Sequence, residues 1–137
     1  MKYTVIIARL ALALVFIWFG ALKFWFISPA DDLVRDLLAV SMPFIPFGPF
    51  LIFLATYEVA IGVLFLIPRL ERWAVGFLLP QMFATFGPLV LLPQQTWVDW
   101  FQPTLIGQYI IKNIIIVALA LLLFSITRQP QQASDNK

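Results

Sequence analysis

Residues 4–26 read TVIIARLALALVFIWFGALKFWF, and this apolar run decides the class of fold. A helix needs about 20 mostly apolar residues to cross a bilayer, and the run provides them. It is too long for the apolar region of a signal peptide and it contains Arg9, so we expect a helix that is retained. The first predicted element is therefore a membrane-spanning helix that carries charge.

Composition extends this prediction to the whole chain. Of the 137 residues, 62% are hydrophobic and 12% are charged, whereas about 25% are charged in a typical soluble domain. These values exclude a soluble globular protein, a disordered chain and a coiled coil. The predicted spans are residues 4–26, 50–67, 73–92 and 104–127. We expect an all-α fold, an integral membrane four-helix bundle in a single domain.

The segments between and after the spans are short. Residues 29–40 place their acids and Arg35 on one face and apolar residues on the others. This pattern predicts a short amphipathic helix in the membrane interface between the first two spans. Residues 93–103 are predicted to be a polar loop, and the polar tail 129–137 is predicted to be disordered.

The distribution of basic residues predicts the orientation. Cytoplasmic loops of membrane proteins carry an excess of Lys and Arg. One side of this chain holds Lys2, Arg69, Arg72, Arg128 and Lys137, and the other holds Lys23 and Arg35. We therefore expect both termini in the cytoplasm. The scattered basic residues predict no nucleic-acid partner, and the expected partner is the lipid bilayer.

Two residue types are absent from the chain, which contains no Cys and no His. Their absence excludes thiol–disulfide exchange, Cys-ligated iron–sulfur clusters and His-ligated haem or zinc. Glu58 is the one acid within an apolar run, so four carboxylates cannot form a di-iron site inside the bundle. We therefore expect no metal site, and any electrons would pass through an organic cofactor or a partner protein.

Three ionisable residues are predicted within the apolar layer, where each charge is costly. Glu58 lies near the middle of its span. A rise of about 1.5 Å per residue places Arg9 and Lys112 within reach of it from opposite sides. Together with Gln81 and Asn113 they form a predicted central polar cluster of formally positive charge.

The predicted cluster allows three interpretations. It is a structural core that holds the helices in register, or a pocket whose spare positive charge attracts an anionic or carbonyl-bearing ligand, such as a quinone head group. The third interpretation is a proton or ion path through Glu58. The corresponding functions are a structural or assembly protein, an auxiliary subunit of a membrane redox system, and a small-solute or ion transporter.

Three further residues are second candidates for the site. Lys23 lies near the outer interface, where a long side chain can reach water by snorkelling. Trp18 and Tyr57 lie at mid-depth, where aromatic side chains either pack or flank a flat ligand.

Two helix faces are predicted to pack closely, because small residues stand beside charged ones at alternating spacings of four and three. One face consists of Arg9, Ala13, Phe16, Gly20 and Lys23, and the other of Leu51, Ala55, Glu58, Gly62 and Phe65.

Three sequence motifs together resemble one protein family. They are Arg9-Leu10 with FIWFGALKF at residues 16–24, EVAIG at 58–62 followed by Arg72-Trp73, and GQYIIKN at 107–113. The chain resembles the DoxX-like membrane proteins over about residues 5–127, and most closely the branch related to reactive-chlorine-resistance membrane proteins.

This resemblance implies a four-helix bundle in the bacterial cytoplasmic (inner) membrane. It also implies an association with respiratory or oxidative-stress redox systems, as an accessory subunit of an oxidoreductase assembly. A protein in such a role would not be catalytic on its own. A homo-oligomer is the alternative that we consider for the partner. The first outer loop of this chain is shorter than in the chlorine-resistance branch.

Overall fold

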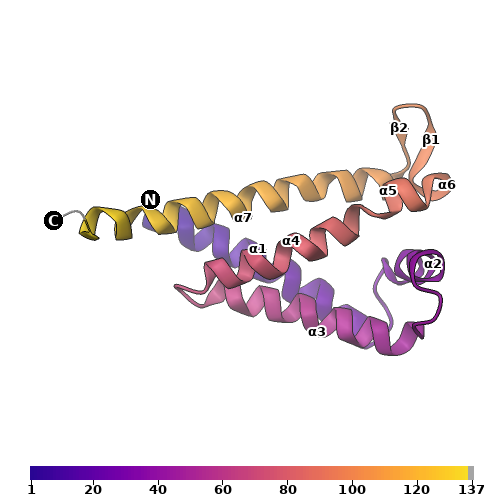
Figure 1. Ribbon diagram of the computed structural model, residues 1–137, viewed down its shortest axis with the longest axis horizontal. Coiled ribbons are helices and arrows are strands. Elements are labelled where there is room, and N and C mark those ends of the chain that lie inside the picture. The colour runs from indigo at the N-terminus through magenta and orange to yellow at the C-terminus, as the bar shows by residue number, and fades with distance from the viewer. Residues whose placement is uncertain (136–137) are drawn as a thin grey trace.

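The computed structural model describes the backbone of residues 1–135 and the side chains of residues 1–128. Four segments in it are helices long and apolar enough to cross a membrane. They are α1 (Lys2–Phe24), α3 (Phe47–Leu66), α4 (Glu71–Phe86) with its continuation α5 (Pro88–Leu91), and α7 (Leu105–Asp135) (Figure 1). The predicted all-α bundle is confirmed, and the chain is a multi-pass membrane protein.

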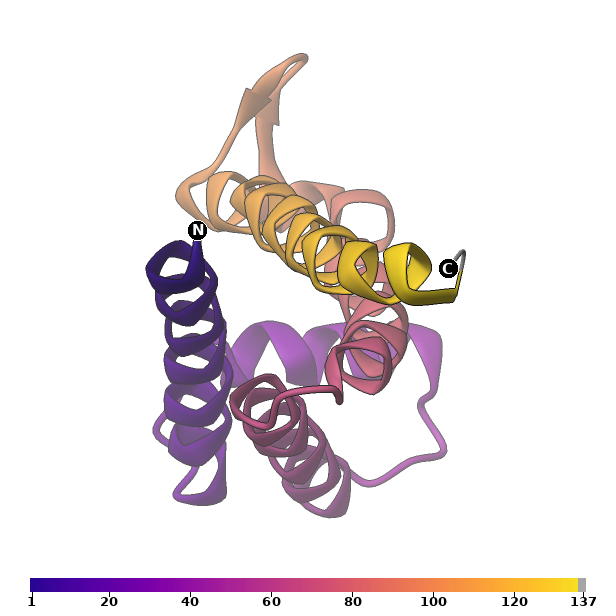
Figure 2. The ribbon, with the colours of Figure 1, turned by 90° about the vertical axis from the view of Figure 1, so that its left-hand side faces the viewer.

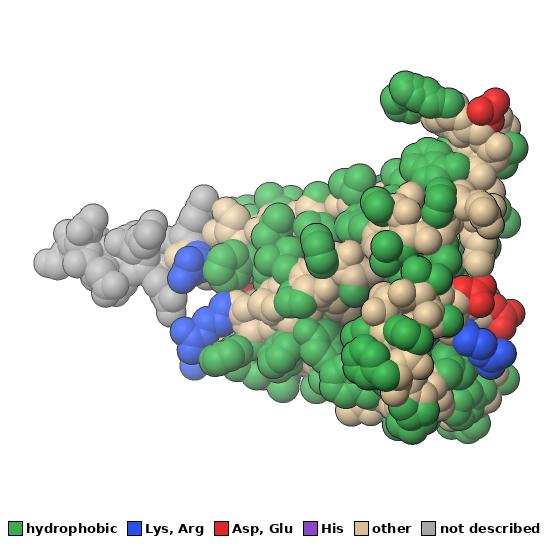
Figure 3. Space-filling model, turned by 45° about the vertical axis from the view of Figure 1, so that its right-hand side comes forward, with side chains coloured by type: hydrophobic (Ala, Val, Ile, Leu, Met, Phe, Trp, Pro, Cys, Tyr) green, Lys and Arg blue, Asp and Glu red, His purple; other side chains and the backbone are tan. Residues whose placement is uncertain are grey.

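The four long helices alternate in direction along the bundle. Both ends of the chain and the turn from α3 to α4 lie at one end, which we call the terminal end (Figure 1). The opposite end, which we call the loop end, holds α2 (Asp31–Ser41), α6 (Pro93–Thr96) and a hairpin of β1 (Trp97–Asp99) and β2 (Gln102–Pro103). Figure 2, a view onto the terminal end, shows α1 beside α3 and α7 beside α4. Apolar side chains cover much of the flank in Figure 3, as a bilayer requires.

The closest helix pair is α1 and α3, and glycines set its spacing. A Cβ atom on Gly20 would lie 3.0 Å from Glu58 Cβ, and one on Gly62 would lie 2.6 Å from Ile17 Cγ1. The helix backbones approach closely because neither glycine has a side chain. Both predicted packing faces lie inside this contact, where every member except the half-buried Arg9 is buried.

The third span is interrupted near the loop end. Helix α4 contains Pro80 and ends at Phe86, and α5 starts at Pro88, whose ring fits the first turn of a helix. Together they form a span from Glu71 to Leu91, close to the predicted 73–92.

The connection between α5 and α7 is more ordered than the predicted polar loop 93–103. Thr104 N donates a hydrogen bond to Thr96 O at 2.9 Å, and Thr104 Oγ1 donates to Gln95 O at 2.6 Å. Gly107 N in turn donates to Thr104 Oγ1 at 3.1 Å. These bonds fix the start of α7 against α6 and close the base of the hairpin, which projects from the bundle (Figure 1).

Two element boundaries differ from the prediction. The amphipathic helix predicted at 29–40 is α2, which begins at Asp31 and ends at Ser41. The tail 129–137 was predicted as disordered, whereas α7 continues to Asp135. Residues 136–137 lie outside the described residues.

Candidate functional site

The centre of the candidate site is an ion pair between α1 and α3. Lys23 Nζ donates a hydrogen bond to Glu58 Oε2 at 2.7 Å and another to Phe19 O at 3.3 Å. Both charged residues are buried, with Lys23 4% exposed and Glu58 7% exposed. The prediction that Lys23 snorkels to the interface is wrong, because its ammonium group turns inward to neutralise Glu58.

Gln81 of α4 completes the group. Its Nε2 donates to Glu58 Oε1 at 2.7 Å, so both carboxylate oxygens of Glu58 have a partner. Gln81 Oε1 is buried and has no hydrogen-bond partner among the described residues. An ammonium group has three N–H donors, and two of those on Lys23 are used within the described structure. The polar group therefore keeps two N–H donors, one on Lys23 and one on Gln81 Nε2, and one acceptor for a further molecule.

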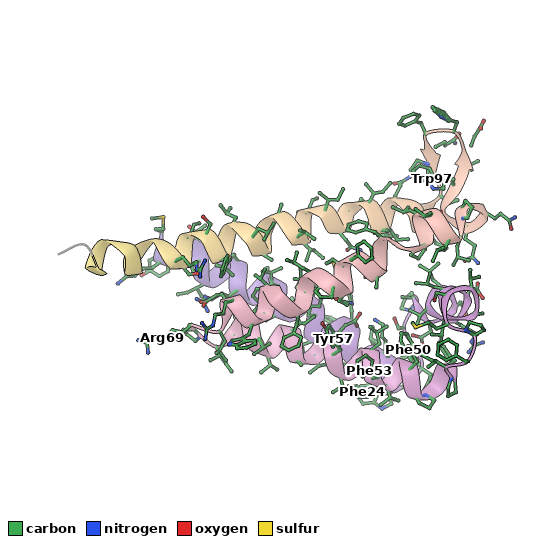
Figure 4. All side chains as sticks on the ribbon, in the orientation of Figure 1. Phe24, Phe50, Phe53, Tyr57, Arg69 and Trp97 are labelled. Atoms are coloured by element: carbon green, nitrogen blue, oxygen red, sulfur yellow. The ribbon has the colours of Figure 1, made fainter. Side chains whose placement is uncertain are left out.

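These three residues line a mostly apolar pocket of about 390 Å³, to which Ser41 and Thr85 contribute the other polar side chains. The rest of the wall comes from α2, α3, α4 and α5, with Phe50 and Leu54 of α3 among its apolar members (Figure 4). Small-ligand pockets commonly have volumes of about 300–1,000 Å³ and combine apolar walls with a few placed polar groups. The geometry is therefore that of a binding pocket.

Helix α2 covers one side of this pocket, and another side, lined by exposed residues such as Phe83, is open. Its apolar face, including Leu33, Val34 and Leu37, lines the cavity. A hydrogen bond from Gln95 Nε2 to Asp36 Oδ2 at 2.7 Å joins α2 to α6. The amphipathic helix between the first two spans thus places its apolar side over the polar group of the bundle.

The predicted pairing of Arg9, Glu58 and Lys112 is wrong. Arg9 forms its ion pair with Glu71 at the terminal end. Lys112 is exposed, and its Nζ lies 5.2 Å from the centre of the Tyr109 ring. The depth estimate assumed that all spans share one centre. The close approach at the glycines instead staggers α1 against α3, which brings Lys23 to Glu58 and carries Arg9 past it.

The remaining predicted site residues do not line the pocket. Trp18 is 59% exposed and faces outward. Tyr57 Oη donates to Phe77 O at 2.8 Å, and the rings of Tyr57 and Phe77 meet edge to face at 5.7 Å, so Tyr57 joins α3 to α4. Asn113 is half-buried on α7. Of the predicted cluster, only Glu58 and Gln81 line the pocket.

Sequence reasoning missed two features of the site. One is the partner of Arg9: Glu71 lies between the predicted spans 50–67 and 73–92, and their bounds did not place it beside Arg9. The other is the position of α2 over the pocket. The sequence contains one indication of it, which is the set of apolar residues opposite the charged face of this helix.

Comparisons with known proteins give no match: neither a family model, nor a curated protein, nor a solved structure matches this chain. The class of protein therefore follows from the fold and the site. The chain is a multi-pass membrane protein whose bundle contains a covered apolar pocket with a buried ion pair.

Proposed function

We propose that the protein binds a small, largely apolar molecule with a carbonyl or hydroxyl head group, and that a quinone is the class that fits best. In this proposal it is an auxiliary subunit of a membrane redox or oxidative-stress system, as its resemblance to DoxX-like proteins implies. The observation that carries the proposal is the Lys23–Glu58–Gln81 group at the wall of the covered apolar pocket.

The polar group matches such a head group chemically. The remaining N–H of Lys23 suits a carbonyl oxygen, and the unpartnered Oε1 of Gln81 suits a hydroxyl donor. The apolar wall suits a ring and its hydrocarbon tail. A bound quinone would supply two-electron chemistry, and Lys23 and Glu58 would hold protons beside it.

A subunit role follows from the composition of the chain. Without Cys or His it lacks the side chains that ligate the usual protein redox metals, so electrons would arrive through a partner protein. The excess of Lys and Arg at the terminal end supports a cytoplasmic location for both termini. The bacterial inner membrane is what the resemblance to DoxX-like proteins implies.

Ligand titration tests this proposal. Protein in quinone-free lipid nanodiscs is titrated with decylubiquinone and with menadione, and binding is followed by quenching of Trp fluorescence. We expect saturable binding that weakens at least about tenfold in Gln81→Leu, which removes the free acceptor, and in Ala84→Leu, which fills the pocket.

Gln108→Leu is the matched control, because Gln108 is an exposed residue of α7 outside the pocket lining. It should bind as the unmodified protein does. Absence of saturable binding, or equal affinities for Gln81→Leu and Gln108→Leu, would refute the proposal.

One observation favours a second candidate, a structural or assembly role. Lys23 and Glu58 neutralise each other, and the Cβ of Glu58 packs directly against Gly20. Removing one partner of a buried pair costs roughly 3–5 kcal/mol, whereas replacing both with apolar residues is often neutral. If the pair is only structural, the double variant Lys23→Met/Glu58→Met should fold and bind any ligand as tightly as the unmodified protein does. If the pair is part of a ligand site, the same variant should fold but lose its affinity for the ligand.

A further inference from the structure

The terminal end contains a second hollow, which differs from the pocket in its charge. It has a volume of about 1440 Å³ and is bounded by α1, the turn before α4, α4 itself and α7. Its charged residues are Lys2, Arg9, Arg69, Glu71, Arg72 and Arg128. Five basic side chains thus face one acidic side chain. We call this feature the basic hollow.

Arg9 is half-buried, whereas the other four basic residues of the basic hollow are exposed. Its side chain is 13% exposed and forms an ion pair with Glu71 through Nη2. Its Nη1 is buried and has no hydrogen-bond partner among the described residues. A buried donor without a partner is unfavourable. An anion with several oxygen acceptors in the hollow would satisfy it.

Three arginines at the rim are exposed, and two of them, Arg72 and Arg128, lie over aromatic rings. The guanidinium carbon of Arg72 lies 5.5 Å from the centre of the Trp73 ring, and that of Arg128 lies 4.7 Å from the centre of the Phe124 ring. Arg69 has a φ of 78°, a left-handed backbone that is uncommon outside glycine and is often found at functional sites. Figure 4 shows Arg69 at the tip of the turn between α3 and α4.

The walls of the basic hollow favour a lipid over a free anion. Apolar side chains from α1 and α7 stand beside the basic ones, among them Val5, Ile6 and Ile126. The hollow lies where the spans end, which is the level of lipid headgroups, and basic pockets between helix ends there bind phosphate-bearing headgroups.

We propose that the basic hollow binds the phosphate of an anionic phospholipid headgroup, with Arg9 at its base and Arg69, Arg72 and Arg128 at its rim. The apolar wall contacts the first part of the acyl chains. General attraction of basic residues to the membrane surface does not require a half-buried arginine whose Nη1 is buried without a partner. This feature distinguishes a binding site from the excess of basic residues that predicts the orientation. The proposal is independent of the quinone pocket.

Native mass spectrometry of the full chain in detergent micelles tests the site. The protein is mixed with phosphatidylglycerol, with cardiolipin or with zwitterionic phosphatidylcholine, and the fraction of lipid-bound protein is measured. We expect the anionic lipids to bind in preference to phosphatidylcholine. We also expect the double variant Arg69→Gln/Arg128→Gln to lower anionic-lipid occupancy at least about fivefold.

Arg35→Gln is the matched control, because Arg35 is also an exposed arginine over an aromatic ring, 4.5 Å from the centre of Phe47, but at the loop end. It should keep the occupancy of the unmodified protein. Equal losses in Arg35→Gln and in the double variant, or equal binding of phosphatidylcholine, would overturn the proposal. Displacement of lipid by millimolar inorganic phosphate would overturn the lipid assignment and identify the free anion as the ligand. Far-UV circular dichroism checks that each variant is folded.

Discussion

Gly62 and Gly20 determine which charged side chains meet. They lie where α1 and α3 are closest, and they fix the stagger of the two helices. With this stagger Lys23 stands beside Glu58, and Arg9 stands beside Glu71 at the terminal end. Two glycines without a functional side chain thus determine the partners in both ion pairs of the described structure.

Substitution of Gly62 should separate α1 from α3. A Cβ atom there would meet Ile17 Cγ1 at 2.6 Å and Ala13 O at 3.0 Å. We expect Gly62→Ala to lower the free energy of unfolding by about 1–3 kcal/mol, the usual effect of overpacking. Unfolding by sodium dodecyl sulfate in mixed micelles, followed by circular dichroism, measures the change.

Gly76→Ala provides the control within α4, because no atom lies within 4 Å of a Cβ placed there. It should be neutral or stabilising by up to about 1 kcal/mol, since alanine favours helix. If both variants unfold at the same detergent fraction, the glycine contact does not fix the helix pair.

The residues of the site were partly predictable. The spacing of small and charged residues predicted the packed faces of α1 and α3, because helical periodicity fixes which residues share a face. It did not predict the pairing, because periodicity contains no information about how far one helix is shifted along another. The same reason explains why Lys112 was placed near Glu58, whereas it lies beside Tyr109 on an exposed face.

Helix α2 covers one side of the pocket. One side-chain hydrogen bond, donated by Gln95 to Asp36, connects α2 to α6. Loss of that bond should let the cover open more often. The chain has no native cysteine, so Val34→Cys, within the pocket lining, reports opening through its rate of reaction with a maleimide.

We expect Asp36→Ala to raise this labelling rate about fivefold, because a partly buried hydrogen bond to a carboxylate contributes roughly 1 kcal/mol or more. Asp32→Ala, which removes an exposed acid from the same helix, should leave the rate unchanged. Equal labelling rates of Val34→Cys in the Asp36→Ala and Asp32→Ala variants would show that the hydrogen bond from Gln95 to Asp36 does not hold α2 over the pocket.

The small elements at the loop end were beyond sequence prediction. Helix α6 has four residues and the strands of the hairpin have three and two, so none spans enough residues for a hydrophobic period to appear. Thr96 and Thr104 stabilise these elements through hydrogen bonds to the backbone. Those hydrogen bonds depend on contacts between α6 and the start of α7.

At the scale of the whole molecule, the four spans were predictable because each is a long apolar run. The structure also strengthens the charge argument for orientation. The ammonium group of Lys23 is withdrawn into an ion pair. Arg35 is therefore the exposed basic residue of the described segments that join the spans at the loop end, whereas the exposed basic residues at the terminal end are Lys2, Arg69, Arg72 and Arg128.

Thiol labelling of intact cells checks the resulting topology. With both termini in the cytoplasm, a membrane-impermeant maleimide should label Asp99→Cys at the hairpin and leave Pro68→Cys unlabelled until the membrane is permeabilised. Both positions are exposed at opposite ends of the bundle, so each serves as the control for the other. The reverse pattern would mean that the bundle is inserted the other way round.

The ion pair of Lys23 and Glu58 also bears on how the protein is made. It joins α1 and α3, and the second of these helices ends at Leu66. Both helices therefore leave the ribosome before any residue of α4. The two opposite charges can therefore neutralise each other within the first helical hairpin during insertion, and neither has to wait in lipid for a later segment. We expect α4 and α7 to join a helix pair in which Lys23 and Glu58 are already matched, whereas Arg9 meets its partner Glu71 only when α4 arrives.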